Sequence, residues 1–448
     1  MKSNSPRSCP DATCSQTRSE QGNDAGSICG LPTVTNSAPR VEMAVAATEP
    51  ARFSFHFLAV SYTLTVLVLG ANIPTPLYGL YRDEFDFTPF TQTAIFAVYA
   101  AGLIPALLFF GPLSDKLGRR FVLLSSVVVA LTSAAVMMYA DGTLWLFAGR
   151  TLQGVSIGAV SAAGVAALTE FEPTNTRAKA AVTATLATVL GAALGPIVGG
   201  ALAQYLHPPL KVPYLIFAIL LIPAAFALIF LPDRRQEPGK QLRYFNTPNI
   251  PRVIRKVFWL ASSRVAVAWG AVGLFQSIIP AWVATTLDIQ NLVLVGGIAA
   301  LVMLLSVLAQ LGLRRLRPLA AQRFGLLAVG GGMAALLAVD IYPHPIVLVL
   351  SASLVGVGHG LVFSGGMREL NIALAASLDG NDGAVIAAFL TINYAGMAIP
   401  SLCAGLAVTA LGFTTAVAAF TIFGVFFCGL CLAVSVLVAD KKGASTAS

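Results

Sequence analysis

The segment Gly111–Arg120, GPLSDKLGRR, decides how the chain is arranged. It lies between two apolar runs of about 20 residues, and it carries one acid and three bases. A run of about 20 apolar residues is what a helix needs to cross the hydrocarbon core of a bilayer. The segment therefore predicts two membrane-crossing helices joined by a charged turn at the membrane surface.

The composition extends this interpretation to the whole chain. Of its 448 residues, 56% are hydrophobic and only 11% are charged, whereas soluble domains carry about 25% charged residues. This excludes a soluble protein of this size. The net charge of +8 could indicate nucleic acid, but the bases are distributed as membrane topology requires. The six cysteines show no metal-ligand spacing with histidine, so we expect no metal and no cofactor.

Apolar runs recur from residue 54 onward, and in lipid only helices satisfy the backbone of such runs. We predict an all-α membrane protein with twelve transmembrane helices. Nearly all of the 28 lysines and arginines then fall on one side, which the positive-inside rule assigns to the cytoplasm together with both termini. The predicted spans are 54–80, 91–111, 121–139, 143–167, 178–203, 212–232, 257–287, 292–313, 320–340, 345–366, 384–408 and 412–438.

Short matches at an offset of about 205 residues predict two related halves, as in transporters built from repeats. Ile73-Pro74 falls opposite Ile279-Pro280, and Pro196 falls opposite Pro400. Gln153-Gly154 likewise falls opposite His359-Gly360. The predicted organisation is a disordered cytoplasmic tail (1–52), a six-helix bundle (53–232), a basic linker (233–256), a second six-helix bundle (257–438) and a cytoplasmic tail (439–448).

Twelve helices, two halves and this charged segment together resemble the major facilitator superfamily. The resemblance covers residues 53–438, and the family's loop signature is G-x-L-x-D-x-x-G-R-[KR]. It implies a membrane transporter that works by alternating access on a small-molecule substrate, functions as a monomer in the inner or plasma membrane and is not an enzyme. The matching positions are Gly111, Leu113, Asp115, Gly118, Arg119 and Arg120.

In the family this segment latches the cytoplasmic side. The resemblance implies that Asp115 meets the N-terminus of helix 11, whose unpaired amides attract a carboxylate. Arg119 would tie Asp115 to Glu170, or to Glu172. Gly111 and Gly118 are expected to let the backbone approach its neighbours closely. The alternative is a basic loop with an incidental acid.

A second family signature, R-x-x-Q-G in helix 4, matches at Arg150, Gln153 and Gly154. In the family this arginine is linked to proton coupling, and an arginine inside a span is costly unless it is paired or solvated. The alternative is that Arg150 snorkels to the outer interface. Gly154-Val155-Ser156-Ile157-Gly158 also fits a G-x-S-x-G pattern, so an intramembrane hydrolase with Ser156 and His359 is a remote alternative.

Helix 5 resembles the antiporter signature G-x-x-x-G-P-x-x-G-G. Its glycines can pack backbone to backbone against a neighbour, and its proline can bend the helix. The family pattern favours proton-coupled efflux. A glycine-rich packing helix is the alternative, and an importer or a proton-independent facilitator stays open. The matching positions are Gly191, Gly195, Pro196, Gly199 and Gly200.

Proton coupling needs a titrating group, yet every acid is expected in a tail, a loop or a helix end. His359, inside helix 10, is the candidate, unless it is a neutral histidine that hydrogen-bonds across helices. Arg264 could hold an anion in the cavity or could snorkel. Further candidates for the cavity lining, any of which could instead join two helices, are Tyr62, Asn72, Gln276, Asn393 and Tyr394.

Overall fold

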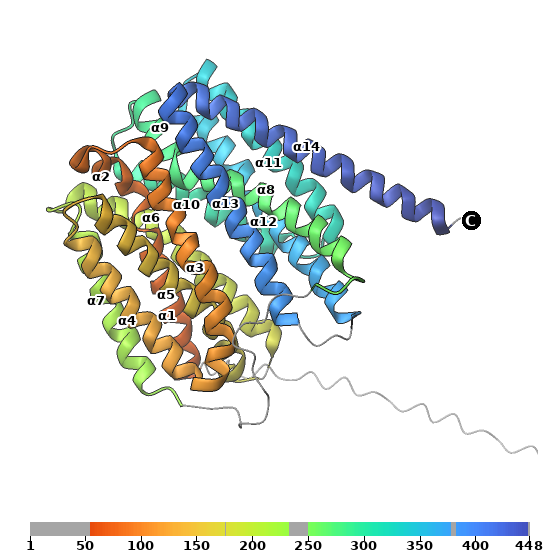
Figure 1. The fold of residues 1–448 in the computed structure, drawn as a ribbon, viewed down its shortest axis with the longest axis horizontal. Helices are drawn as coiled ribbons and strands as arrows, with labels where there is room; N and C mark the ends of the chain where they lie inside the picture. Colours follow the sequence, from red (N-terminus) through yellow and green to blue (C-terminus); the bar gives the residue numbers. More distant parts are fainter. Residues whose placement is uncertain (1–53, 175, 233–249, 378–381, 447–448) are drawn as a thin grey trace, which may run out of the picture. The chain divides into compact units, whose positions relative to one another are not determined.

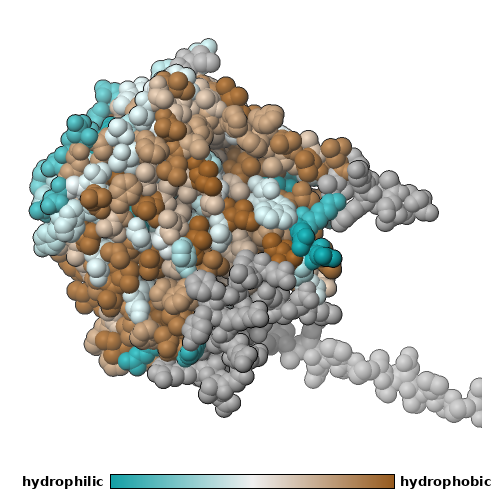
Figure 2. All heavy atoms as spheres, in the orientation of Figure 1, coloured by the Kyte–Doolittle hydropathy of each residue, from teal (hydrophilic) through white to brown (hydrophobic). Residues whose placement is uncertain are grey.

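The protein was analysed as a computed structural model, which describes residues 54–174, 176–232, 250–377 and 382–446. The described residues belong to one compact unit, and all of their regular structure is helical. Twelve of its helices are long and apolar enough to cross a membrane, which confirms the predicted fold class. Figure 2 shows mainly apolar side chains on the visible face of these helices. The predicted tail 1–52 and most of the predicted linker lie outside the described residues.

The helices follow one another without a strand between them in the described chain (Figure 1). Those before the linker are α1 (Phe55–Asn72), the 3-10 turn η1 (Thr75–Leu77), α2 (Tyr78–Phe85), α3 (Pro89–Leu117), α4 (Arg119–Met138), α5 (Thr143–Phe171), α6 (Arg177–Tyr205) and α7 (Val212–Ile229). Those after it are α8 (Arg255–Ser277), α9 (Ile279–Thr286), α10 (Leu292–Gly312), α11 (Pro318–Ile341), α12 (Pro345–Ala375), α13 (Asp382–Leu411) and α14 (Phe413–Thr446).

The internal repeat appears as matching helix breaks. Pro74 lies between the end of α1 and the start of η1, as the N-cap of η1, and Pro280 is the second residue of α9, which follows the break at Ile278. A proline has no amide hydrogen to donate, so a helix readily breaks or bends at it. The first predicted span is therefore divided into α1, η1 and α2, and the seventh into α8 and α9. The domain boundaries that we predicted around the linker remain a prediction.

Glycines repeat the same packing in each half. A Cβ atom at Gly154 of α5 would overlap the carbonyl oxygen of Tyr99 of α3. The matching Gly360 of α12 lies in the same way against the carbonyl oxygen of Ser306 of α10. Lipid tails are as apolar as the helix side chains, so the hydrophobic effect does not drive membrane helices together. They associate instead through close backbone contacts of this kind. Gly154 and Gly360, which the sequence comparison aligned, therefore have the same packing role in the two halves.

Several helices are longer than predicted, and this corrects one interpretation. The predicted span 345–366 is part of α12, which runs on to Ala375. Glu369 consequently lies inside a helix, so the prediction that every acid lies in a tail, a loop or a helix end was wrong. Likewise α3 runs to Leu117 and includes most of the charged segment, and Gly118 ends it with a φ of 93°, a value that glycine adopts without strain.

The two sets of helices contact one another through α6 with α10 and through α3 with α13. Glycines allow α6 and α10 to touch: a Cβ at Gly200 would overlap the carbonyl oxygen of Leu292, and one at Gly296 that of Pro196. At the second contact, the amide of Phe90 in α3 donates to the Thr409 hydroxyl of α13 (3.0 Å). The first contact lies near the loops 206–211 and 287–291, and the second lies near residues 86–88 and Gly412; by the predicted topology all of these loops are at the outer end.

Candidate functional site

Arg150 lies buried in the middle of the first six-helix set. Only 3% of it is exposed, and its Nη1 donates to the carbonyl oxygen of Ala71 in α1 (2.7 Å) and to Oε1 of Gln153 (2.6 Å). The guanidinium carbon lies 4.8 Å from the ring centroid of Tyr99, a cation–π distance. The alternative that Arg150 snorkels to the interface was therefore wrong. In the part of the chain that the structure describes, no carboxylate pairs with it.

The surroundings of Arg150 are rich in hydrogen-bond donors. Tyr78 is buried within electrostatic range of the guanidinium, and its hydroxyl makes no hydrogen bond to the described residues. Nε of Arg150 and Nε2 of Gln153 are equally unpartnered there. Unpaired donors around a positive charge favour an anionic or strongly accepting group. Sequence reasoning missed Tyr78 and Tyr99, because an aromatic residue in an apolar span carries no signal of its own.

His359 lies in the second set, within an aromatic row. Its Nδ1 is 2.8 Å from the Ser306 hydroxyl of α10, while Nε2 has no partner among the described residues. The ring packs edge-on against Trp269 (centroids 4.7 Å apart), and Trp269 lies 5.6 Å from Tyr394. Tyr394 in turn packs against a cluster formed by Ala97 and Ala100 of α3 and Ala398 of α13, so the row reaches the contact with the other half. The geometry matches the alternative of a histidine that bonds across helices; its role in coupling remains a proposal.

Arg264 has a different environment from the cavity that we predicted. Only 3% of it is exposed, so it does not snorkel. Its Nη1 lies 3.4 Å from Oε2 of Glu369 and 3.0 Å from Oε1 of Gln322, and Nε2 of Gln322 donates to the same carboxylate (2.6 Å). These contacts join α8, α11 and α12. A buried, paired arginine of this kind connects helices, and the ion pair was missed because Glu369 was expected outside a helix.

The latch residues are described only in part. The side chain of Asp115 lies outside the described residues. Arg119 donates to the hydroxyl of Ser114 in the preceding turn, Arg120 is half-buried at the start of α4, and Glu170 lies in the last turn of α5. Among the described residues, no close contact is found at Gly111, since a Cβ there would meet open space.

Glu172, the alternative partner of Arg119, caps the next helix. Its carboxylate accepts the backbone amides of Thr174 (2.9 Å) and Thr176 (2.6 Å) and the Thr174 hydroxyl, directly before α6. Burial by itself raises the pKa of Glu172, but these hydrogen bonds lower the pKa further than burial raises it. Glu172 is therefore an anionic cap at the N-terminus of a helix, where the helix dipole stabilises negative charge.

The glycine motif predicted for the fifth transmembrane helix lies on α6, where it forms two packing faces. A Cβ atom at Gly191, Gly195 or Gly199 would overlap a backbone carbonyl oxygen of α1 or of its C-cap, Ile73. Gly200 and the carbonyl of Pro196 instead meet α10, which belongs to the other half. Sequence spacing predicted a close helix contact, and the structure adds that the motif packs against one helix of each half.

The remaining cavity candidates separate into two groups. Tyr62 is 37% exposed and donates to the carbonyl oxygen of Leu220 in α7 (2.9 Å), so it joins two helices. Asn72 donates to Val68 of its own helix (2.8 Å) and faces Gly195. Gln276 and Asn393 are buried, with amide atoms that have no partner among the described residues.

Ser156 does not form the dyad of the hydrolase alternative. Its hydroxyl donates to the carbonyl oxygen of Ser126 in α4 (2.8 Å), whereas His359 lies against Ser306 of α10. A nucleophilic serine needs a base within hydrogen-bond reach. That alternative was wrong.

Twelve helices that are long and apolar enough to cross a membrane, with buried arginine, histidine and aromatic side chains between them, define a polytopic α-helical membrane protein. The family model of the Major Facilitator Superfamily matches residues 58–399. The chain belongs to this family.

Several curated proteins are similar to parts of the chain. A probable quinate permease of Aspergillus clavatus is 28% identical over 220 residues, which cover 43% of this chain and 41% of the permease. The multidrug resistance protein MdtM of Escherichia coli is 26% identical over 246 residues, 53% and 58% of the two chains. MdtL of Salmonella paratyphi C is 31% identical over 182 residues, 40% and 45%. The chain thus spans about half the length of the curated relatives it matches.

The fold also matches solved structures. A bacterial homologue of the human lysosomal transporter Spinster was solved in inward-facing conformations, unoccupied and occupied. The TM-scores are 0.65 and 0.66 at 14% and 15% identity, over 88% of this chain and 98% of the other. At this identity the likeness establishes the shared fold.

Proposed function

We propose that this protein is a secondary transporter that exports small organic molecules in exchange for protons. The packing of α6 is the observation that carries the proposal. On one face of α6, the glycines of the antiporter-type motif pack against α1. On another face, Gly200 packs against α10 of the other half. A helix that contacts both halves through bare backbone can change its contacts when the halves move, which alternating access requires.

Arg150, Gln153 and His359 are the proposed coupling residues. All three are buried, and among the described residues each keeps an unpartnered nitrogen: Nε of Arg150 and Nε2 of Gln153 can donate to a substrate group, whereas Nε2 of His359 can take up a proton. The similarity to multidrug resistance proteins of enteric bacteria supports export, although it covers part of each chain. We place the protein in the inner or plasma membrane as a monomer, with both termini in the cytoplasm.

The conformation supports a role for the latch. The contacts between halves that involve Gly200, Gly296 and Thr409 lie at the proposed outer end, so we assign this structure to the inward-open state. Asp115, Gly118, Arg119 and Glu170 would then stabilise the opposite, outward-open state. Replacing Asp115→Asn should keep the fold and raise the inward-open population. Unchanged thiol accessibility of single cysteines at both ends would contradict the latch.

A second function is favoured by the charge at the centre. Arg150 is buried with donors around it and without a described carboxylate, an environment that suits an organic anion and disfavours a lipophilic cation. The similarity to a probable quinate permease points the same way. The alternative is therefore an importer or facilitator of a small carboxylate.

One experiment separates these proposals. Purified protein in sealed liposomes is offered a phosphonium cation, a neutral lipophilic dye and quinate, with and without an imposed pH gradient. Uptake of cation or dye against the proton flow, abolished by a protonophore, supports antiport. Quinate flux that ignores the gradient supports the facilitator. If none of the three compounds crosses faster than in protein-free liposomes, with or without the gradient, both the antiporter and the facilitator proposals are contradicted.

A further inference from the structure

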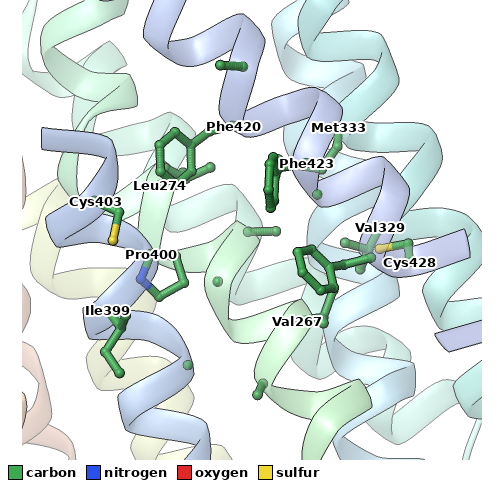
Figure 3. Close-up of a pocket in the computed structure, with 17 residues that line it drawn as sticks. Val267, Leu274, Val329, Met333, Ile399, Pro400, Cys403, Phe420, Phe423 and Cys428 are labelled. Carbon is green, nitrogen blue, oxygen red and sulfur yellow. The ribbon is translucent and has the colours of Figure 1, made fainter. Parts of the chain in front are cut away.

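A cavity of about 600 Å³ lies between α8, α11, α13 and α14, within the second set of helices. Its lining side chains are apolar apart from the thiols of Cys403 and Cys428. Figure 3 shows Phe420 and Phe423 of α14 facing Pro400 and Cys403 of α13 across the space. None of the coupling or latch residues lines this cavity, so it is separate from the site described above.

The mouth of the cavity faces the bilayer. Ile399 of α13 and Phe423 of α14 line it with 59% and 61% of their surface exposed, and both lie on candidate membrane spans. Its floor is buried and includes Leu274, Met333 and Cys428. The cavity therefore leads from a surface that contacts lipid into the packed interior of the helices.

The lining determines what can occupy it. Water needs two to four polar partners to enter a cavity, and these walls offer two weak thiols. Sites that recognise a small ligand add a few placed polar groups to an apolar wall, in order to orient it. This wall has only the two weakly polar thiols, so it selects for an apolar chain without regard to orientation. A bilayer presents acyl chains to every opening at this depth.

We propose that this cavity binds one acyl chain of a membrane phospholipid, inserted between α13 and α14. The inference goes beyond the proposed transport function and does not depend on it. Its position gives the chain a mechanical role. On one face of α13, Ala398 packs with Ala97 and Ala100 of the other half, and on the adjacent face Ile399 and Pro400 line the cavity. A bound chain supports α13 from behind this contact.

The test uses the full-length protein in liposomes that contain a phosphatidylcholine with a diazirine near the end of one acyl chain. After irradiation, adducts are mapped by peptide mass spectrometry. We expect adducts to concentrate on the cavity-lining stretches of α13 and α14. Ala419→Phe places a ring in the cavity and should reduce these adducts at least fivefold. Cys403→Phe fills it from the opposite wall and should have the same effect.

Ala433→Phe is the matched control, because Ala433 is an exposed residue of α14 that does not line the cavity. It should leave the adducts unchanged, and an unaltered gel-filtration profile verifies the fold of each variant. Adducts spread evenly over α14 and insensitive to both filling variants would overturn the proposal. So would displacement of the lipid by a photoreactive phosphonium probe, which would indicate a substrate site. Disulfide-linked dimers through exposed Cys403 would assign the face to a second copy instead.

Discussion

In the part of the chain that the structure describes, each half buries one arginine, and the two arginines have opposite surroundings. Arg264 meets a carboxylate and an amide from two other helices, so its charge is compensated within the half. Arg150 meets a carbonyl oxygen, one glutamine and an aromatic face, and no carboxylate in the described chain. Burial alone does not distinguish the two side chains, because both are 3% exposed.

The difference indicates different roles. A buried ion pair is costly to form and more costly to break, so Arg264 and Glu369 belong to the framework that holds α8, α11 and α12. A buried arginine without a carboxylate keeps interaction capacity for a group that arrives during transport. The comparison also shows how far the two halves are alike. They repeat the helix breaks and the glycine contacts, but the partners of their buried arginines differ.

The largest expected effect is on flux. Arg150→Ala should reduce the initial transport rate per folded molecule by about 100-fold, as expected when about 2.7 kcal/mol of interaction in the rate-limiting state is lost. Arg264→Ala should change that rate by less than about threefold. Liposome flux with the substrate found above measures both. The reverse order would mean that the compensated arginine is the functional one.

Stability should show the opposite pattern. Arg264→Ala leaves the Glu369 carboxylate without its cation and should lower the free energy of unfolding by about 1–3 kcal/mol. The loss is below that of a fully buried pair, since 26% of the Glu369 side chain is exposed. Thermal unfolding in detergent measures the change. The double variant Arg264→Met, Glu369→Leu should recover most of the stability; a further loss would show that the pair does more than connect helices.

A smaller effect is expected where the halves touch. Gly296→Ala introduces a methyl group against the carbonyl oxygen of Pro196 and should open the outer contact of α6 with α10, with a several-fold shift of the conformers. Gly297→Ala is its control, because a Cβ at that position meets open space among the described residues. Maleimide accessibility of a single cysteine at the outer end reports the shift. Equal accessibility in the two variants would mean that α6 and α10 are not in contact in the membrane.

The smallest effect concerns the cap of α6. Glu172→Gln removes the anionic cap and should lower Tm by on the order of 1 °C at neutral pH. Hydrogen bonds lower the folded-state pKa of Glu172, so its stabilisation is fully present above the unfolded value of 4.5 and is lost as the pH falls through the lower folded pKa. The difference in Tm between wild type and variant should therefore shrink below pH 4.5. A difference that grows in acid would rule out the anionic cap.

The sequence by itself determined the fold class, the number of spans and the repeat. These properties depend on the length of apolar runs and on where proline and glycine fall, which are local features of the chain. The close packing at Gly154 and Gly158 of α5, and at Gly191 and Gly195 of α6, follows from four-residue spacing, which puts each pair on one face of its own helix.

Only the tertiary structure decided which side chains meet. Glu369 lies 105 residues from Arg264, and the ring of Tyr99 reaches Arg150 from another helix. In a soluble protein the polar face of a helix shows which side points outward. In a bilayer lipid is as apolar as the helix interior, so an apolar run carries little information about which face is buried. Helix packing supplies that information, and with it the ion pair of Arg264, the environment of Arg150 and the lipid-facing cavity.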